Sequence, residues 1–236
     1  MNLKGKVVVV TGSSDGIGKQ VALKLANEGV LLALVARDED RLKEVKNKCL
    51  ELGSSKVESY SCDVSDKDKV KETINKILVD FNTVDILLNI AGVWQELNKL
   101  EDISDEEIDS VININLKGVI YVTKQLLKYF KERDEEAIIL NVSSRSGVTT
   151  QEGQSIYTAS KWGVTGFTEV LKTDLKNSKI RVATLHQGGT NTNLFSKTGE
   201  HFNQDKFIKP EDLADVIVFM LSRPPQIWLH DVRVEY

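Results

Sequence analysis

Length, composition and charge indicate an ordinary compact protein. The chain has 236 residues, of which 41% are hydrophobic and 28% charged, so it can bury a sizeable core. The net charge of -4 argues against binding nucleic acid by bulk electrostatics, and it gives no reason to expect a membrane surface as partner.

The sequence also carries no sign of a membrane, secreted or metal-binding protein. No apolar stretch reaches the roughly 18 residues of a membrane span, and the N-terminus shows no signal-peptide pattern. We therefore expect a cytoplasmic protein. Cys49 and Cys62 lack the spacing of metal ligands, and His186, His201 and His230 are scattered, so no metal site is predicted.

Short apolar runs alternate with longer helical patterns from one end of the chain to the other. Strands are predicted at residues 7–10, 30–36, 57–61, 84–89, 137–142, 180–185 and 227–234. Helices are predicted at residues 16–28, 39–52, 66–80, 105–131, 154–176 and 211–222. Several strand runs are continuously apolar, as in parallel sheets buried on both faces. This alternation predicts an α/β, doubly wound Rossmann fold of about seven parallel strands with helices on both faces, in one domain spanning 1–236.

Local signals mark where some helices begin. Ser65 with Asp68, and Ser104 with Glu107, have the spacing of capping boxes. Pro210 is placed to open the last helix, where its missing N–H costs nothing. Residues 188–209 lack a helical or strand pattern and are rich in Gly, Asn and Thr, so we expect a substrate lid there.

A glycine-rich turn follows the first strand and opens the first helix. Gly12 permits a tight turn, Gly16 lets backbone N–H groups approach a pyrophosphate, and Gly18 lets the helix pack close to the sheet. The free N–H groups at the helix start favour a phosphate. The turn predicts dinucleotide binding through Gly12, Ser13, Ser14, Asp15, Gly16, Ile17 and Gly18.

The end of the second strand indicates which dinucleotide binds. An acidic residue there would bind the ribose 2′-hydroxyl of NAD, but the position holds Ala36, followed by Arg37. A guanidinium matches a 2′-phosphate in geometry and charge, whereas Asp15 and Asp38 would repel one. The sequence therefore favours NADP(H), with NAD(H) as the alternative.

Tyr157 and Lys161 lie four residues apart in a predicted helix, so their side chains share one face. A neighbouring ammonium favours phenolate, which makes the pair a plausible general acid/base for a carbonyl oxygen. The structural alternative is an aromatic at the core edge beside a surface charge. Asn115, in an otherwise apolar helical stretch, and Ser144, at the end of the fifth strand, favour the catalytic interpretation.

Together these motifs resemble the short-chain dehydrogenase/reductase family, in its compact single-domain branch, from about Leu3 to Leu221. The glycine turn matches the family pattern Thr-Gly-x-x-x-Gly-x-Gly. The family's catalytic tetrad falls, in its usual order, on Asn115, Ser144, Tyr157 and Lys161.

The resemblance implies a role for each member of the tetrad. Tyr157 would exchange a proton with the substrate oxygen, and Ser144 would orient the substrate carbonyl. Lys161 would hold the nicotinamide ribose hydroxyls and lower the pKa of Tyr157, while Asn115 would anchor a water that links Lys161 to solvent. The dinucleotide itself would carry the hydride.

The resemblance also extends the predicted cofactor site. Asp63 and Val64 match an acidic-aliphatic pair that contacts adenine, and Thr192 matches a residue that holds the nicotinamide carboxamide. The segment 89–92 matches Asn-Asn-Ala-Gly, with Ile replacing the second Asn. The further cofactor residues expected from these matches are Asn89, Ala91, Gly92, Gly188, Thr190 and Thr192.

The chain departs from the family pattern in two places. Gln187 stands where the family usually has Pro; the turn could be looser, Gln187 could add a polar group to the site, or the change could be tolerated. The neighbouring His186 is expected to be structural. The C-terminus stops without the Gly-Gly segment that helps relatives form tetramers, so we expect a homodimer through the helices at 105–131 and 154–176 and leave a tetramer open.

The predicted activity is hydride transfer between NADP(H) and a small carbonyl or alcohol. One alternative is a 3-oxoacyl-carrier-protein reductase of fatty-acid synthesis, and another is a dinucleotide-sensing protein without turnover. The motifs leave the substrate and the direction open. The residues expected at the substrate are Ser144, Trp94, Gln154 and Phe195, with Ser146, Val148 and Gly189 beside them.

Overall fold

A parallel sheet forms the centre of the molecule. The computed structural model describes residues 2–195, 200, 202–224 and 226–236. Within these ranges, seven strands join in the order β3-β2-β1-β4-β5-β6-β7, and every pairing is parallel. The strands are β1 Val7–Thr11, β2 Leu31–Ala36, β3 Val57–Ser61, β4 Ile86–Asn89, β5 Ala137–Ser144, β6 Ile180–Gln187 and β7 Asp231–Val234. The predicted doubly wound α/β sheet is confirmed.

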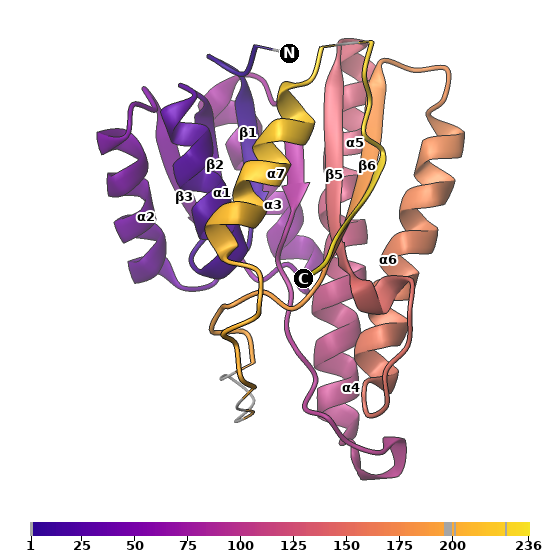
Figure 1. Ribbon diagram of the computed structural model, residues 1–236. Coiled ribbons are helices and arrows are strands. Elements are labelled where there is room, and N and C mark those ends of the chain that lie inside the picture. Colours follow the sequence, from indigo (N-terminus) through magenta and orange to yellow (C-terminus); the bar gives the residue numbers. More distant parts are fainter. Residues whose placement is uncertain (1, 196–199, 201, 225) are drawn as a thin grey trace.

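Helices cover both faces of this sheet. One face carries α1 Gly16–Asn27, α2 Glu39–Glu51 and α7 Pro210–Ser222, and Figure 1 shows α1 and α7 side by side in front of the strands. The other face carries α3 Lys67–Phe81, α5 Gly118–Arg133 and α6 Ser155–Asp174. In β1, Val8 and Val10 pack toward the first group while Val7 and Val9 pack toward the second, because successive side chains alternate across a strand. This burial on both faces explains the continuous apolar runs.

The helix starts are in part as predicted. Ser104 caps α4 (Asp105–Ile112) by accepting from the Glu107 N–H at 3.1 Å, and Pro210 opens α7. The cap predicted at Ser65 is wrong. Asp66 caps α3 instead, accepting from two N–H groups at 2.9 and 3.0 Å, because its carboxylate is one residue closer to the helix.

The long helix predicted at 105–131 is interrupted. Between α4 and α5 the backbone forms a π-helical turn, Asn113–Lys117, which contains Asn115. Such turns insert an extra residue into the helix and often occur at functional sites. The turn rotates Asn115 out of the regular helical register that the hydrophobic pattern implies.

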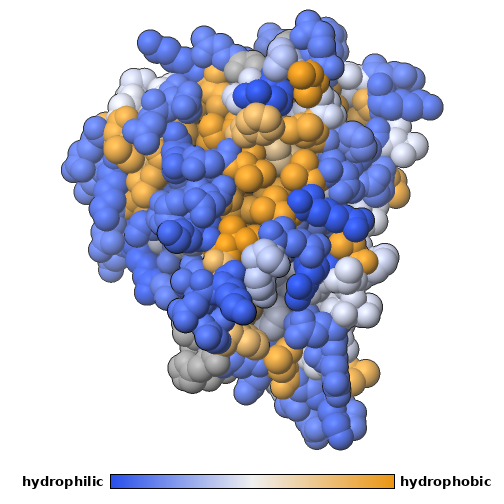
Figure 2. Space-filling model, viewed as in Figure 1, coloured by the Kyte–Doolittle hydropathy of each residue, from blue (hydrophilic) through white to orange (hydrophobic). Residues whose placement is uncertain are grey.

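The C-terminal strand is shorter than predicted, since β7 begins at Asp231 rather than near residue 227. On the face seen in Figure 2, apolar side chains gather over α7 and the C-terminal segment, and both carry exposed aromatic or aliphatic groups such as Phe219 and Ile227. Along the described chain, no helix combines the length and apolar character needed to cross a bilayer. Dimerisation, single-domain organisation and cytoplasmic location stay predictions.

Candidate active site

The glycine turn brings three backbone segments into close contact. Gly12 has φ +71°, and a Cβ there would lie 2.8 Å from the backbone N of Ala91. A Cβ on Gly18 would lie 2.2 Å from the Gly12 carbonyl oxygen. Only glycine fits at either position, so the turn sits tightly between the start of α1 and the segment after β4. Asp15 caps α1 by accepting from the Gly16 N–H at 2.8 Å.

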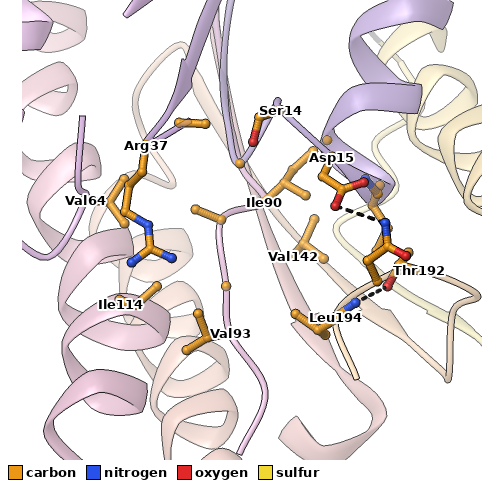
Figure 3. Close-up of a pocket in the computed structure, with 18 of the residues that line it drawn as sticks. Ser14, Asp15, Arg37, Val64, Ile90, Val93, Ile114, Val142, Thr192 and Leu194 are labelled. Atoms are coloured by element: carbon orange, nitrogen blue, oxygen red, sulfur yellow. Dashed lines mark hydrogen bonds between the residues drawn. The ribbon is translucent and has the colours of Figure 1, made fainter. Parts of the chain in front are cut away.

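A cavity of about 410 Å³ opens beside this turn, at the carboxyl ends of β1, β2 and β4. Figure 3 shows Asp15 and Thr192 on one side of it, Arg37 on the other, and Ile90 and Val93 between them. The predicted cofactor residues in its wall are Gly12, Ser14, Asp15, Gly16, Ile17, Gly18, Arg37, Asp63, Val64, Ala91, Gly92, Tyr157, Lys161 and Thr192.

Four predicted cofactor residues lie elsewhere. Ser13 is fully buried and its hydroxyl donates to the Val35 carbonyl, so it lies behind the turn. Asn89 is also buried, and its amide donates to Thr123 and Asn141, which ties β4 to α5 and β5. Both side chains position the cavity wall without lining it. The remaining two, Gly188 and Thr190, line a second cavity.

The sequence reasoning missed several wall residues, of which Arg41 matters most for charge. Arg41, in the first turn of α2, contacts Asp15 at 3.1 Å and Asp38 at 3.3 Å. Arg37 contacts Asp63 at 3.8 Å. Two half-exposed guanidinium groups and three carboxylates thus face one end of the cavity. The signal that could have found it is its place in the first turn of the helix that follows the second strand, a few residues after Arg37. The other missed wall residues are Cys62, Ile90, Val93, Ile114, Val142, Asn193 and Leu194. Ala36, Asp38 and Gln187, which the sequence already places near the cofactor, also lie in the wall.

Tyr157 and Lys161 are both buried at the other end, with exposed fractions of 3% and 5%. The Lys161 Nζ lies 5.7 Å from the centre of the Tyr157 ring and donates to the Val142 carbonyl at 3.2 Å. Both residues line the cavity. The alternative of a surface charge at Lys161 is therefore wrong, because its side chain is buried. A lysine is rarely buried without a function or a partner.

Burial dominates the proton affinities of this pair. It raises the pKa of Tyr157 to about 12, while a hydrogen bond from Ser144 acts in the opposite direction. It lowers the pKa of Lys161 to about 8. The resemblance implies that Lys161 lowers the Tyr157 pKa, but here the opposing influence comes from Ser144. At neutral pH the phenol is protonated, the form that can donate to a carbonyl oxygen.

Ser144 ends β5 with its hydroxyl directed toward this phenol. Its Oγ accepts from the Ser146 N–H at 3.1 Å, so the hydroxyl proton stays available to donate. His186, which pairs with Ser143 on the neighbouring strand β6, has Nδ1 3.4 Å from the Ser144 carbonyl oxygen. Burial lowers the pKa of His186 below its usual value, so the ring is neutral at neutral pH and supports the strand end. This agrees with the structural role expected for it.

Asn115 holds the segment after β4 against α6. Its Oδ1 accepts from the Val93 N–H at 2.8 Å, and its Nδ2 donates to the Val93 carbonyl at 2.9 Å and to Ser160 at 3.2 Å. A Cβ on Gly92 would lie 3.2 Å from this Oδ1 and 3.7 Å from Lys161 Nζ. Asn115 is therefore next to Lys161 but behind the cavity wall, with its side chain fully engaged.

Gln95 is a second residue that the sequence reasoning missed. It is fully buried, and its Oε1 accepts from the N–H groups of Ile156 and Tyr157 at 2.9 and 2.7 Å. Its Nε2 donates to the Gly153 carbonyl at 3.1 Å. Gln95 thus caps α6 from a distant segment and fixes the turn that carries Tyr157. No local signal identifies it, because its partners lie about 60 positions away.

A smaller cavity of about 230 Å³ meets the first at Tyr157. All four predicted substrate residues, Ser144, Trp94, Gln154 and Phe195, lie in its wall, as do Ser146 and Gly189. Val148 does not. Tyr157 and Gln187 line both cavities, together with Ile17, Thr192 and Leu194, so the phenol is part of the wall at which ligands held in the two cavities would meet.

The predicted lid, 188–209, borders this smaller cavity. Residues 196–199 and 201 lie outside the described part of the chain. Among the others, Phe195 packs on Trp94 with ring centres 5.0 Å apart, and Phe202 on Phe195 at 5.1 Å. The Glu200 carboxylate accepts from Trp94 Nε1 and from the Leu97 N–H, both at 2.6 Å. These contacts join the segment to the loop after β4, over the phenol.

Comparisons with known proteins agree with this geometry. A family model described as short chain dehydrogenase matches residues 6–203. The chain is 34% identical over 230 residues to the 3-oxoacyl-(acyl-carrier-protein) reductase FabG of Thermotoga maritima, which covers 94% of this chain and 92% of that protein. The chain belongs to the short-chain dehydrogenase/reductase family.

Solved structures of other family members superimpose along nearly the whole chain. The alcohol dehydrogenase of the archaeon Thermococcus sibiricus, solved with 5-hydroxy-NADP, gives a TM-score of 0.89 at 26% identity, over 98% of this chain and 96% of that one. The 3-ketoacyl-(acyl-carrier-protein) reductase of Brucella melitensis, solved with NADH, gives 0.87 at 29% identity, over 98% and 97%.

These relatives make the chain a dinucleotide-dependent oxidoreductase of small molecules, with a nicotinamide dinucleotide as cofactor. The dinucleotide-sensing alternative is not supported, because the relatives are named as reductases and dehydrogenases. Within the described residues, no group of His, Cys, Asp or Glu is arranged to hold a metal ion; His201 lies outside them.

Proposed function

We propose that the protein transfers a hydride between NADP(H) and a small carbonyl or alcohol substrate, with Tyr157 as the general acid/base. One observation carries the proposal. The phenol of Tyr157 lies in the wall shared by the large cavity beside the glycine turn and the small cavity beside Ser144. A dinucleotide in the first and a carbonyl compound in the second would both reach it.

The large cavity suits a dinucleotide. Gly12 and Gly18 let the turn pack tightly at the start of α1, where N–H groups and the helix dipole favour a pyrophosphate. At the far end, Lys161 offers an ammonium to the ribose hydroxyls. When bound, the nicotinamide supplies or accepts the hydride.

The remaining chemistry belongs to the side chains. During reduction, the protonated Tyr157 donates to the substrate oxygen as the carbonyl carbon gains its hydride, and during oxidation it takes that proton back. Ser144 donates a hydrogen bond to the same oxygen and holds it toward the phenol. The charged Lys161 stabilises the phenolate that forms when Tyr157 gives up its proton.

The preference for NADP(H) is supported by Arg37 and Arg41. Both guanidinium groups lie at the end of the large cavity reached from β2, where the adenosine ribose of a dinucleotide is expected. Asp15, Asp38 and Asp63 already contact them, so a 2′-phosphate would compete with these carboxylates. The two arginines still favour a phosphate at this end of the cavity, because the planar guanidinium fork can bind two phosphate oxygens at once.

A second candidate is a 3-oxoacyl-carrier-protein reductase, favoured by the 34% identity to the Thermotoga maritima enzyme. The small cavity argues for a compact substrate, since it falls below the roughly 300–1,000 Å³ of pockets for drug-sized ligands. Measuring kcat/KM for a 3-oxoacyl group on carrier protein and for a small free ketone would separate the two candidate functions. A kcat/KM at least tenfold higher for the carrier-bound substrate would establish the second candidate.

The direct test of the proposal is Tyr157→Phe, measured by NADPH absorbance and by cofactor binding. We expect turnover to fall about 100- to 10,000-fold, the usual contribution of general acid/base catalysis, with cofactor affinity unchanged. Tyr121→Phe is the matched control, because Tyr121 belongs to α5 and lines neither cavity. Full activity in Tyr157→Phe would refute the assignment.

A further inference from the structure

The small cavity has an aromatic side. Trp94, Phe195, Phe202 and Phe207 form a chain of ring contacts, with ring centres 5.0 Å apart for Trp94 and Phe195, and 5.6 Å apart for Phe195 and Phe207. Trp94 also packs on Tyr157 at 4.6 Å. Aromatic faces favour flat partners, with which they stack or make edge contacts. This side of the cavity therefore suits a ring close to the phenol.

Other parts of the wall carry two buried amides, Gln154 and Gln187, with exposed fractions of 4% and 8%. The oxygen of each is already taken. Ser146 Oγ donates to Gln154 Oε1 at 2.8 Å, and Thr190 Oγ1 donates to Gln187 Oε1 at 2.6 Å. Among the described residues, nothing accepts from either amide nitrogen. Both amides are thus oriented as hydrogen-bond donors toward the cavity, and the described part of the chain offers them no acceptor.

Donors that face the cavity without an acceptor disfavour a purely hydrocarbon ligand, because a ligand that displaced their water without replacing its hydrogen bonds would cost free energy. A site built to donate hydrogen bonds rejects an analogue that lacks the matching acceptor. Ser144 and Tyr157 already serve the oxygen that reacts. The amides therefore call for a second oxygen on the same molecule, and the volume of about 230 Å³ limits that molecule to roughly one ring.

We propose that the substrate is a monocyclic carbonyl compound with a second oxygen acceptor, such as a cyclic dione, stacked on Trp94 and Phe195 and held by the Gln154 amide. This inference rests on the proposed function. The reacting carbonyl carbon gains a hydride from NADPH, its oxygen gains the Tyr157 proton, and solvent reprotonates Tyr157. The product is a hydroxyketone plus NADP⁺, with the second carbonyl unchanged.

The test is a panel of four compounds that separates the ring from the second oxygen: cyclohexanone, cyclohexane-1,4-dione, hexan-2-one and hexane-2,5-dione. We expect cyclohexane-1,4-dione to have a kcat/KM roughly tenfold above each of the others, the ratio set by one hydrogen bond or one ring contact. Equal or better turnover of the open-chain dione would overturn the ring requirement. Equal turnover of cyclohexanone would overturn the requirement for a second acceptor.

Two variants connect these preferences to their residues. Gln154→Leu should reduce the dione-to-cyclohexanone ratio of kcat/KM to about one. Gln226→Leu is the matched control, since Gln226 is exposed outside both cavities. Phe195→Leu should lower kcat/KM for both ring compounds relative to the open-chain pair. A dione preference that survives Gln154→Leu would remove Gln154 from the proposal.

Calorimetry separates failure of this inference from failure of the proposed function. The dione is titrated into the protein with NADP⁺ present, where no reduction occurs. Binding of the dione tighter than of hexane-2,5-dione, without turnover in NADPH, would support the pocket and refute the proposed reaction. Turnover of open-chain ketones that depends on Tyr157 and equals or exceeds that of the ring compounds would support the reaction and refute the pocket. Arg145 also lines the cavity, so tighter binding of 4-oxocyclohexanecarboxylate than of the dione would replace the neutral second oxygen with a carboxylate.

Discussion

The buried ammonium of Lys161 should make the stability of the protein increase with pH in a defined window. Burial lowers its pKa from 10.5 to about 8, so between these values the unfolded chain binds a proton that the folded chain does not. The free energy of unfolding therefore rises as pH increases through this window. From pH 7.5 to 9.5 the gain from this one group is about 2 kcal/mol.

Other groups contribute to the same measurement and must be subtracted. Burial raises the pKa of Cys49 to about 12, so its folded form keeps a proton that the unfolded chain loses above pH 9, which lowers stability there. The raised pKa of Tyr157 acts in the same direction, but mainly above pH 10. Lys161→Met removes one titration and leaves these others in place.

The assay is urea unfolding of the cofactor-free protein at pH 7.5 and 9.5, for the wild type and Lys161→Met, followed by circular dichroism. We expect the wild type to gain about 2 kcal/mol more than the variant over this interval. Equal pH dependence in the two proteins, within about 0.5 kcal/mol, would refute a depressed pKa at Lys161.

Three further outcomes are expected. Arg37→Ala and Arg41→Ala should each weaken NADP(H) binding roughly tenfold and NAD(H) binding much less; NADP(H) affinities equal to wild type would refute the site of the 2′-phosphate. Gly18→Ala should lower stability by about 2 kcal/mol or more in thermal unfolding, because its Cβ would lie 2.2 Å from a carbonyl oxygen, whereas Gly166→Ala, with open space, should not. Gln95→Leu should lower kcat about tenfold without changing cofactor affinity, and Gln95→Glu, which keeps the acceptor, should recover most of it; no loss in Gln95→Leu would show that capping α6 does not position the phenol.

Features that depend on neighbouring residues are predictable from the sequence. The apolar runs identify the strands because β1 and its neighbours are buried on both faces. The glycine turn is recognisable because Gly12 needs a positive φ and the steric limit at Gly18 comes from the Gly12 carbonyl, only six residues away. The spacing of Tyr157 and Lys161 places them on one helical face wherever the helix lies.

Features that depend on distant segments are decided only by the tertiary structure. Gln95 caps α6 and Glu200 binds Trp94 across about 60 and 106 positions, and no local pattern requires either contact. The π-helical turn at Asn115 breaks a helix that the hydrophobic pattern predicts as continuous. The orientation of Gln154 and Gln187 as donors depends on hydroxyls contributed by Ser146 and Thr190 once the chain has folded.

The proton affinities show the same division. The sequence by itself determined a Tyr–Lys pair in a dinucleotide-binding sheet, because helical spacing and strand order follow from local pattern. Burial decided the rest: it keeps the Tyr157 phenol protonated, depresses the Lys161 pKa and leaves Ser144 as the group opposing the rise at Tyr157. Desolvation is a property of the packed interior, so only the tertiary structure could set it.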